Sequence, residues 1–380
     1  AGVCWRTVCA VSPLTTEVGG TMIITQTLIP RRPRLEIGPL STVWRARIAV
    51  VNLALVVLVL VVFAANVAAG DYPLTIMKVF EVLAGGGTKI EQTVVLKWRL
   101  QRALGAVVIG MALGIAGALT QSVTRNPLAS PDILGISEGA SAFAVSIIVL
   151  GGLNASGAVQ FLSTIGIPLS ALLGALLTAT VIWYLGSRRG MDTFRLVLAG
   201  IMITAILQAY VTLLLVRATI TDAAVAKTWL TGSLGASSWG RNFPVVVVLC
   251  CVIPLVGYVS FKLQAVLLGD QTASGLGVHV SRAQTLFLLL SVVLTAIAVS
   301  AAGPIGFIAF VAPQVALRLM ATSSPPLIGS GLCGAMLLAT ADLITRTILP
   351  VELPVGLVTS AVGGVFLVYL LIRANRKSTV

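Results

Sequence analysis

Long apolar runs alternate with short polar connectors along most of the chain. A membrane-spanning helix needs about 20 mostly apolar residues, with a range of about 17–25. We predict ten such helices: 47–69, 100–122, 133–152, 160–186, 194–216, 243–262, 283–302, 304–320, 326–349 and 354–373. The join between the seventh and eighth, around Gly303 and Pro304, predicts either a turn or a kink.

Three connectors are longer than the rest: 70–98, 217–242 and 263–281. We expect a short helix near 74–84 in the first, and residues 227–234 are a candidate short helix in the second. Residues 1–21 lack an apolar core of signal-peptide length, and Met22 is a plausible native start. We therefore expect residues 1–44 to form a tail that is disordered or partly non-native, followed by one transmembrane domain over 45–375.

Composition supports lipid as the solvent for most side chains. Charged residues make up 10% of the chain and hydrophobic residues 57%, whereas soluble domains have about 25% and about 45–50%. The net charge is +13, but Lys and Arg occur in short clusters between apolar runs, which argues against a nucleic-acid surface. More of them fall on the cytoplasmic side if both termini lie there, so we predict a multi-pass protein of the cytoplasmic (inner) membrane with that topology.

Side chains for chemistry are scarce. His279 is the single histidine, and the five cysteines lack metal-ligand spacing, so we predict no metal site. The Gly-rich segment 85–89 does not match a P-loop, and an enzyme is not expected. Glu138 begins the third span, and no carboxylate is expected near the middle of a span, which disfavours an ion-coupled carrier. Asp342 lies four residues before Arg346, so the two side chains can pair on one helix face.

Five short motifs occur in order among these spans: WRLQR at 98–102, RNPLASPDILGIS at 125–137, GPIGFIAFVAPQ at 303–314, ADLITR at 341–346 and ELPVG at 352–356. Together they resemble the FecCD family, the permease subunits of type II ABC importers for iron-siderophores, haem and cobalamin. The resemblance covers about residues 45–375. The chain departs from the family pattern at Gln101 (usually Pro), Gln314 (commonly His) and Thr345 (usually Ala).

The resemblance implies an all-α permease fold with ten transmembrane helices and a role in ATP-driven import of ferric siderophore. A haem or cobalamin importer of the same family remains an alternative, and an ion-coupled secondary transporter is a further one. It also implies a second permease subunit, for which we favour a heterodimer over a homodimer, two cytoplasmic ABC ATPase subunits and an extracytoplasmic substrate-binding protein. This chain would bind no cofactor, since ATP and Mg would be used by the partner ATPase.

The resemblance also suggests three sets of functional residues. Arg99, Arg102 and Arg346 match positions where the family docks the acidic knobs of its binding protein. Connector 263–281 resembles the family's ATPase-coupling element, with two short helices formed by Leu267, Leu268, Gly269 and Asp270 and by Ser274, Leu276, Gly277 and Val278. The fifth and tenth helices line the family's translocation path, and Thr204, Gln208 and Thr212 could form a polar stripe on the fifth, although helix packing is an equally good explanation of them.

Overall fold

The computed structural model describes residues 13–18, 21–26, 34–37, 40–43, 45–70, 72, 74–151, 158–187, 193–267, 269–348 and 352–378. The chain divides into two compact units, Ala1–Val51 and Asn52–Val380. In the first unit, strand β1 (Pro13–Val18) pairs antiparallel with β2 (Thr21–Gln26), and β3 (Arg34–Ile37) pairs with β4 (Leu40–Val43). The expected tail over 1–44 stays a prediction.

The second unit is all-α in its described residues, which confirms the predicted fold class. A π-helical segment (Thr93–Arg99) leads directly into the fourth helix, and a 3-10 segment (Pro131–Leu134) precedes the fifth. In chain order the helices are α1 (Ala46–Ala68, which begins in the first unit), α2 (Ile76–Leu83), α3 (Lys89–Gln92), α4 (Leu100–Thr124), α5 (Ile136–Gly151), α6 (Ala158–Ser187), α7 (Thr193–Arg217), α8 (Ile220–Leu230), α9 (Trp239–Leu267), α10 (Asp270–Gly275), α11 (Val280–Ala302), α12 (Ile308–Met320), α13 (Leu327–Thr347) and α14 (Val355–Ser378).

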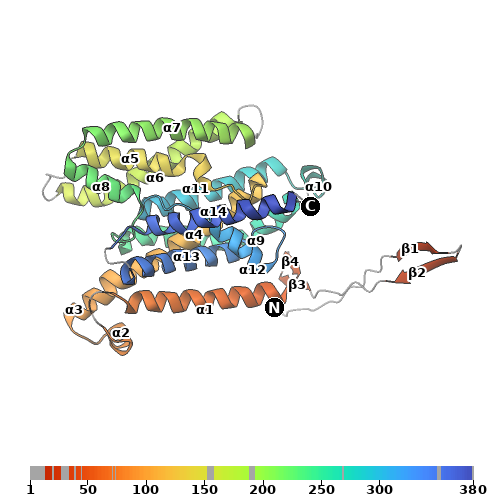
Figure 1. The fold of residues 1–380 in the computed structure, drawn as a ribbon, viewed down its shortest axis with the longest axis horizontal. Helices are drawn as coiled ribbons and strands as arrows, with labels where there is room; N and C mark the ends of the chain where they lie inside the picture. Colours follow the sequence, from red (N-terminus) through yellow and green to blue (C-terminus); the bar gives the residue numbers. More distant parts are fainter. Residues whose placement is uncertain are drawn as a thin grey trace. The chain divides into compact units, whose positions relative to one another are not determined.

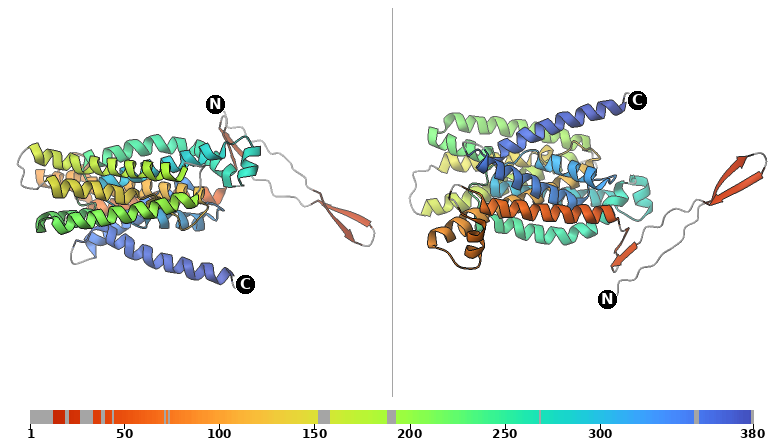
Figure 2. Two further views of the ribbon diagram at one scale, coloured as in Figure 1. Left: turned by 90° about the horizontal axis from the view of Figure 1, so that it is seen from above. Right: turned by 60° about the horizontal axis from the view of Figure 1, so that its bottom comes forward.

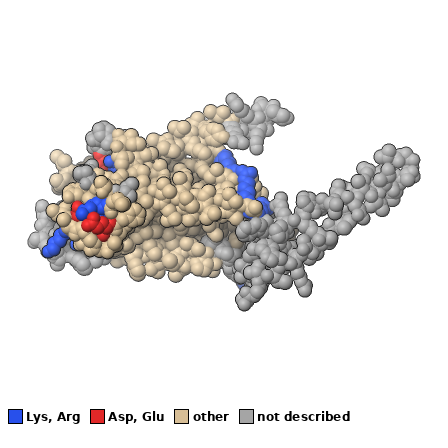
Figure 3. Space-filling model, turned by 90° about the horizontal axis from the view of Figure 1, so that it is seen from below, with Lys and Arg blue, Asp and Glu red and all other residues tan. Residues whose placement is uncertain are grey.

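Each predicted span coincides with one of these helices. Within the described residues, six helices are long and apolar enough to cross a membrane: α1, α4 with the residues that lead into it, α6, α7, α11 and α13. Shorter apolar helices lie at the other four predicted spans, in α5, α9, α12 and α14. On the face shown in Figure 3, the charged side chains of the described residues gather toward the two ends and leave an uncharged band between them. This is the pattern of a multi-pass membrane protein.

The first two long connectors agree with the prediction in part. The short helix expected near 74–84 is present as α2. The helix expected at 227–234 instead begins at Ile220 and ends at Leu230, so that prediction was wrong in its bounds. Its start is fixed by Thr219, whose hydroxyl accepts a hydrogen bond from the backbone N–H of Asp222. A capped first turn outweighs the apolar pattern that had suggested a later start.

A break in the backbone separates the seventh and eighth spans. Helix α11 ends at Ala302 and α12 begins at Ile308, so the segment between them is a turn and not a kink in one helix. Gly303 has φ +76° and Phe307 has φ +66°, both left-handed conformations that interrupt the helical ladder. The eighth span is consequently only 13 residues long.

Helix α4 forms the centre of the bundle, with α13, α11, α12 and α9 packed around it (Figures 1 and 2). At its crossing with α13, a Cβ added to Gly334 would lie 2.1 Å from the carbonyl oxygen of Gly110, and one added to Gly110 would lie 2.4 Å from that of Gly334. The two backbones are therefore in direct contact, which only glycine allows. Small residues give membrane helices their packing contacts, since lipid offers no hydrophobic drive between them.

Polar side chains inside this core satisfy one another. The side-chain amide of Gln314 donates to that of Gln121 (2.8 Å), which in turn donates to the carbonyl oxygen of Phe310 (3.0 Å). Both glutamines are buried. At the position where the family commonly has histidine, this chain thus holds an amide that joins α4 to α12 as part of the core.

Candidate functional site

The three predicted docking arginines come together at one end of the bundle. Arg99 ends the π-helical segment, Arg102 lies in the first turn of α4, and Arg346 lies in the last turn of α13. One helical turn before Arg346, Asp342 faces the same place. We call these four residues together with Glu352, which lies just before α14, the arginine cluster.

Asp342 links two of the arginines. Arg102 Nε donates to Asp342 Oδ1 at 2.9 Å, and Arg346 Nε lies 3.4 Å from Asp342 Oδ2. The pairing of Asp342 with Arg346 predicted from their spacing is confirmed. Arg102 also donates through Nη1 to Glu352. The Asp342 side chain is completely buried, so its two cationic neighbours are what makes an ionised carboxylate tolerable there.

The remaining donors of the cluster bind the end of α1. Arg99 donates to the carbonyl oxygens of Ala68 (2.8 Å) and Tyr72 (2.6 Å). Arg346 donates to the side-chain oxygen (2.7 Å) and the carbonyl oxygen (3.0 Å) of Asn66. The last carbonyls of a helix lack partners within it and carry a partial negative charge, so cations there stabilise it. The cluster therefore fastens α1 to α4 and α13.

Little of the cluster faces outward. Arg99 is 5% exposed, and the side chains of Arg102 and Arg346 are 13% and 10% exposed. Glu352, at 61%, is its most exposed member. Arg102 is paired with this exposed carboxylate, so another protein could recruit Arg102 by taking the place of Glu352.

The connector 263–281 forms a single short helix, where two were expected. Leu267 ends α9, Leu268 lies outside the described residues, and α10 covers Asp270–Gly275. After α10, the N–H of Val278 donates to the carbonyl of Ala273 (3.0 Å) and the N–H of Gly277 donates to that of Ser274 (3.0 Å).

These two bonds form a Schellman motif, which requires the left-handed conformation of Gly277 (φ +80°). Gly269 (φ +103°) stands on the other side of α10. Leu276 is largely exposed, so the connector presents an apolar side chain on a rigid, capped turn.

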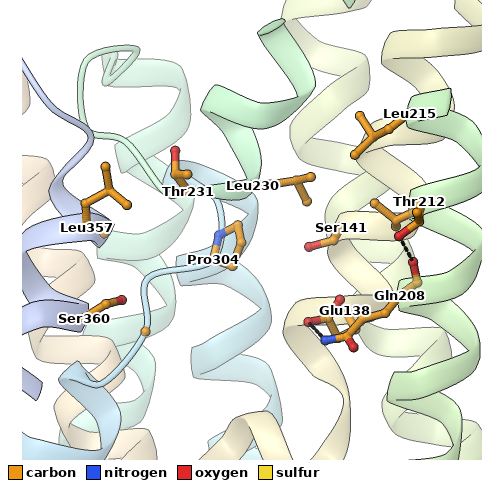
Figure 4. A pocket seen from close by; sticks show the side chains of 13 residues that line it. Glu138, Ser141, Gln208, Thr212, Leu215, Leu230, Thr231, Pro304, Leu357 and Ser360 are labelled. Carbon is orange, nitrogen blue, oxygen red and sulfur yellow. Dashed lines mark hydrogen bonds between the residues drawn. The ribbon is translucent and has the colours of Figure 1, made fainter. Parts of the chain in front are cut away.

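A pocket of ≈ 600 Å³ lies between several helices (Figure 4). Two of the three residues suggested for a translocation path, Gln208 and Thr212 of α7, line it; Thr204 is not among its lining residues and lies beside Gly135. The other lining residues come from α7 itself, from α5, from α8 and the residue after it, from the break between α11 and α12, and from the start of α14: Val211, Leu215, Glu138, Ser141, Leu230, Thr231, Pro304, Gly306, Gly356, Leu357 and Ser360. The pocket thus combines the fifth and tenth predicted spans.

Glu138 is the charged group of this pocket. Its Oε1 accepts a hydrogen bond from Gln208 Nε2 (3.1 Å), and Thr212 Oγ1 donates to the carbonyl of Gln208 (2.9 Å) (Figure 4). Gln208 lies near the midpoint of α7, so the carboxylate stands level with the middle of a spanning helix although it belongs to the first turn of α5. Glu138 itself lies in the first turn of its own span, so this contact does not contradict the expectation that no carboxylate lies near the middle of a span. A carboxylate at this depth that faces a cavity is a functional group by default.

The described residues contain no group of three or more His, Cys, Asp or Glu that could hold a metal ion. The pocket offers a ligand one carboxylate, amide and hydroxyl groups, and backbone at the helix break as polar partners.

Comparison with known proteins agrees with this arrangement. The model of the FecCD transport family matches residues 57–373. The ferric enterobactin transport system permease protein FepG of Escherichia coli is 40% identical over 81% of this chain and 91% of its own length. The iron(3+)-hydroxamate import system permease protein FhuG of Bacillus subtilis is 34% identical over 84% and 95%. A solved metal-chelate type ABC transporter, in an inward-facing conformation, has the same fold with a TM-score of 0.73, at 23% identity over 86% of this chain and 99% of that one.

Proposed function

The chain belongs to the FecCD transport family, and on this basis we propose that it is the transmembrane permease subunit of an ATP-driven ABC importer that carries ferric siderophore across the cytoplasmic membrane. The observation that carries the proposal is the family match over 57–373, which begins within α1, ends within α14 and includes the lining of the pocket. Relatives with this fold are named as permeases for ferric enterobactin and for iron(3+)-hydroxamate. The pocket, with its polar groups at mid-membrane depth, suits a hydrophilic cargo.

The importer would divide its work among several chains. Hydrolysis of ATP, with Mg, belongs to two separate cytoplasmic ATPase subunits, because this sequence has no P-loop. A second permease subunit, which we take to be a homologue and not a second copy, would complete the pathway. The ends of successive spans alternate between the two sides of the membrane. If both termini are cytoplasmic, the arginine cluster would lie on the extracytoplasmic side and α10 on the cytoplasmic side, where the ATPases bind.

We propose that the arginine cluster receives carboxylates of an extracytoplasmic binding protein, chiefly through Arg102. Arginine pairs bidentately with carboxylate, which fixes orientation as well as affinity. The partner's carboxylate would take the place of Glu352, the exposed partner of Arg102. Arg99 and Arg346 would support this contact by holding α1, and their own donors would stay inside the chain.

Docking can be tested with two variants that act in opposite directions. Glu352→Gln removes the internal competitor and should tighten binding of the substrate-binding protein to the importer in nanodiscs. Arg102→Gln should weaken it, and both effects should shrink as salt is raised. Equal affinities for the two variants would refute the role of Arg102 while leaving the transport function intact.

We propose that α10 is the coupling element. A short helix that is capped at its end moves as a rigid body, so it can follow a moving ATPase surface in which it is seated. Leu276 would supply the apolar contact, and Gly269 and Gly277 would set the angles at which α10 leaves α9 and enters α11.

Uptake of labelled ferric siderophore tests the function itself. Cells that lack this chain should lose uptake and regain it when the chain is restored, with labelled haem and cobalamin measured in parallel. Loss of haem or cobalamin uptake in place of siderophore uptake would overturn the cargo and keep the architecture. Uptake that persists after the ATPase is removed would overturn the ABC mechanism.

A further inference from the structure

The pocket carries a negative charge that nothing in its lining neutralises. Its lining residues include one carboxylate, Glu138, and no Lys, Arg or His. Among the residues that the structure describes, Glu138 forms no ion pair; the partner of its carboxylate is the neutral amide of Gln208.

The arginine cluster shows how this chain treats a buried carboxylate whose role is to join helices. There Asp342 lies between two guanidinium groups. Glu138 has no such cation, and its side chain is turned into the cavity together with those of Ser141 and Gln208 (Figure 4). An ionised group at membrane depth is costly unless it meets water or a partner. A carboxylate that faces an open pocket in this way is placed to meet a ligand.

The other polar groups around Glu138 are neutral. Ser141, Thr212, Thr231 and Ser360 offer hydroxyl groups, and Gln208 an amide. Hydroxyl and amide groups bind either donors or acceptors, so they set no preference for the sign of a cargo's charge. Glu138 is therefore the lining residue that can distinguish cargoes by the sign of their charge. The volume of ≈ 600 Å³ lies within the usual range for organic ligands of moderate size, about 300–1,000 Å³.

We propose that Glu138, positioned by Gln208, contacts the cargo during translocation and selects ferric chelates of neutral or positive net charge, such as hydroxamates that keep a free amine, over polyanionic catecholates. This inference rests on the proposed function and deepens it. Like charges brought together in a partly desolvated site repel strongly and exclude the wrong partner, whereas an ammonium group gains an ion pair with the carboxylate. The relative named for ferric enterobactin would then differ from this chain in cargo despite its 40% identity.

The test uses two ferric trihydroxamates that differ in one group: a linear chelate with a free amine and the same chelate with that amine acetylated. Uptake is measured in cells with the complete importer, and the ratio of the two rates is compared between the wild-type chain and each variant. Any preference of the binding protein is common to all chains and cancels in this comparison. A ferric tricatecholate, run in parallel, is expected to be the slowest of the three.

Glu138→Gln keeps the hydrogen-bonding shape and removes the charge, so it should lower the amine-to-acetyl ratio by about fivefold, the upper end for one partly hydrated ion pair. Gln208→Glu adds a second carboxylate at the same place and should raise the ratio. The matched control is Glu91→Gln, a glutamate outside the pocket, which should leave the ratio unchanged.

Two results would overturn the inference. An unchanged ratio in Glu138→Gln or in Gln208→Glu would show that the carboxylate does not meet the cargo, while uptake of both trihydroxamates would leave the permease function standing. Uptake of haem or cobalamin with no uptake of any ferric chelate by the wild-type importer would overturn the proposed function and this inference with it.

Discussion

Replacing Asp342 with asparagine should destabilise the permease far more than replacing Glu352, the exposed carboxylate of the arginine cluster, with glutamine. Asp342 is completely buried, with Arg102 Nε at 2.9 Å and Arg346 Nε at 3.4 Å. Asparagine keeps the shape and removes the charge, so two guanidinium groups that are mostly buried lose their shared counter-ion. Breaking a buried ion pair by removing one partner costs about 3–5 kcal/mol.

Two contacts survive the substitution, so we expect the loss in free energy of unfolding to lie at the lower end of this range, about 3 kcal/mol. Arg102 keeps its pair with Glu352, and Arg346 keeps its bonds to Asn66. The matched control is Glu352→Gln, whose side chain is 61% exposed and whose loss should cost about 0–1 kcal/mol. Both variants remove one carboxylate from the same cluster, so they differ in burial and not in net charge.

The measurement is the stability of the purified permease in detergent, by thermal unfolding and by titration with a denaturing detergent. Hydrogen exchange at the last turn of α1 should also rise in Asp342→Asn, because Arg346 would hold that turn less firmly. If Asp342→Asn proved as stable as Glu352→Gln, the buried ion pairs of Asp342 would not be what fastens α1 to α4 and α13. The arginines would then be held by water and not by Asp342.

Three further outcomes follow from other features. Gly334→Ala places a Cβ 2.1 Å from a carbonyl oxygen of α4 and should cost about 1–3 kcal/mol, whereas Gly364→Ala, with nothing within 4 Å, should cost little; equal thermal stabilities would contradict the backbone contact. Gly277→Val should strain the turn after α10 and allow ATP hydrolysis without transport, so normal coupling would exclude α10. At the start of α3, the backbone N–H of Thr88 donates to the Glu91 carboxylate and holds the pKa of Glu91 below its usual value. This hydrogen bond should persist at neutral pH and be lost as pH falls through the lowered pKa. Hydrogen exchange in α3 should then rise in the wild-type chain, whereas the Glu91→Gln variant should show no such dependence on pH.

The spanning helices could be predicted because their length is imposed by the bilayer. A stretch of about 20 apolar residues has few other stable uses, so the spans were located from composition and Pro or Gly punctuation alone. The start of α8 was not, because it depends on one hydrogen bond at Thr219 that competes with the apolar pattern. The nature of the join at Gly303 also stayed open, since Gly-Pro permits either a turn or a kink.

The site residues divide in a similar way. The pairing of Asp342 with Arg346 follows from helix geometry, because residues four apart share a face. The partners of Arg99 and the role of Asn66 depend on where α1 packs, which no local pattern records. The place of Glu138 at the start of its helix could be predicted from the sequence. Its contact with Gln208 could not, because it joins residues of two helices that are 70 positions apart in the chain.

The break between α11 and α12 places irregular backbone beside the pocket. Residues Pro304–Gly306 lie outside the helical ladders of α11 and α12, and Pro304 and Gly306 line the cavity. Hydrocarbon cannot solvate bare peptide groups, so irregular backbone at membrane depth persists only where it is covered by protein or wetted. Water that enters the cavity would therefore solvate this backbone as well as a polar cargo. A step of the transport cycle that removes water from the cavity must give these peptide groups other hydrogen-bond partners. The free-energy cost of exchanging those partners would then add to the work that each cycle of transport requires.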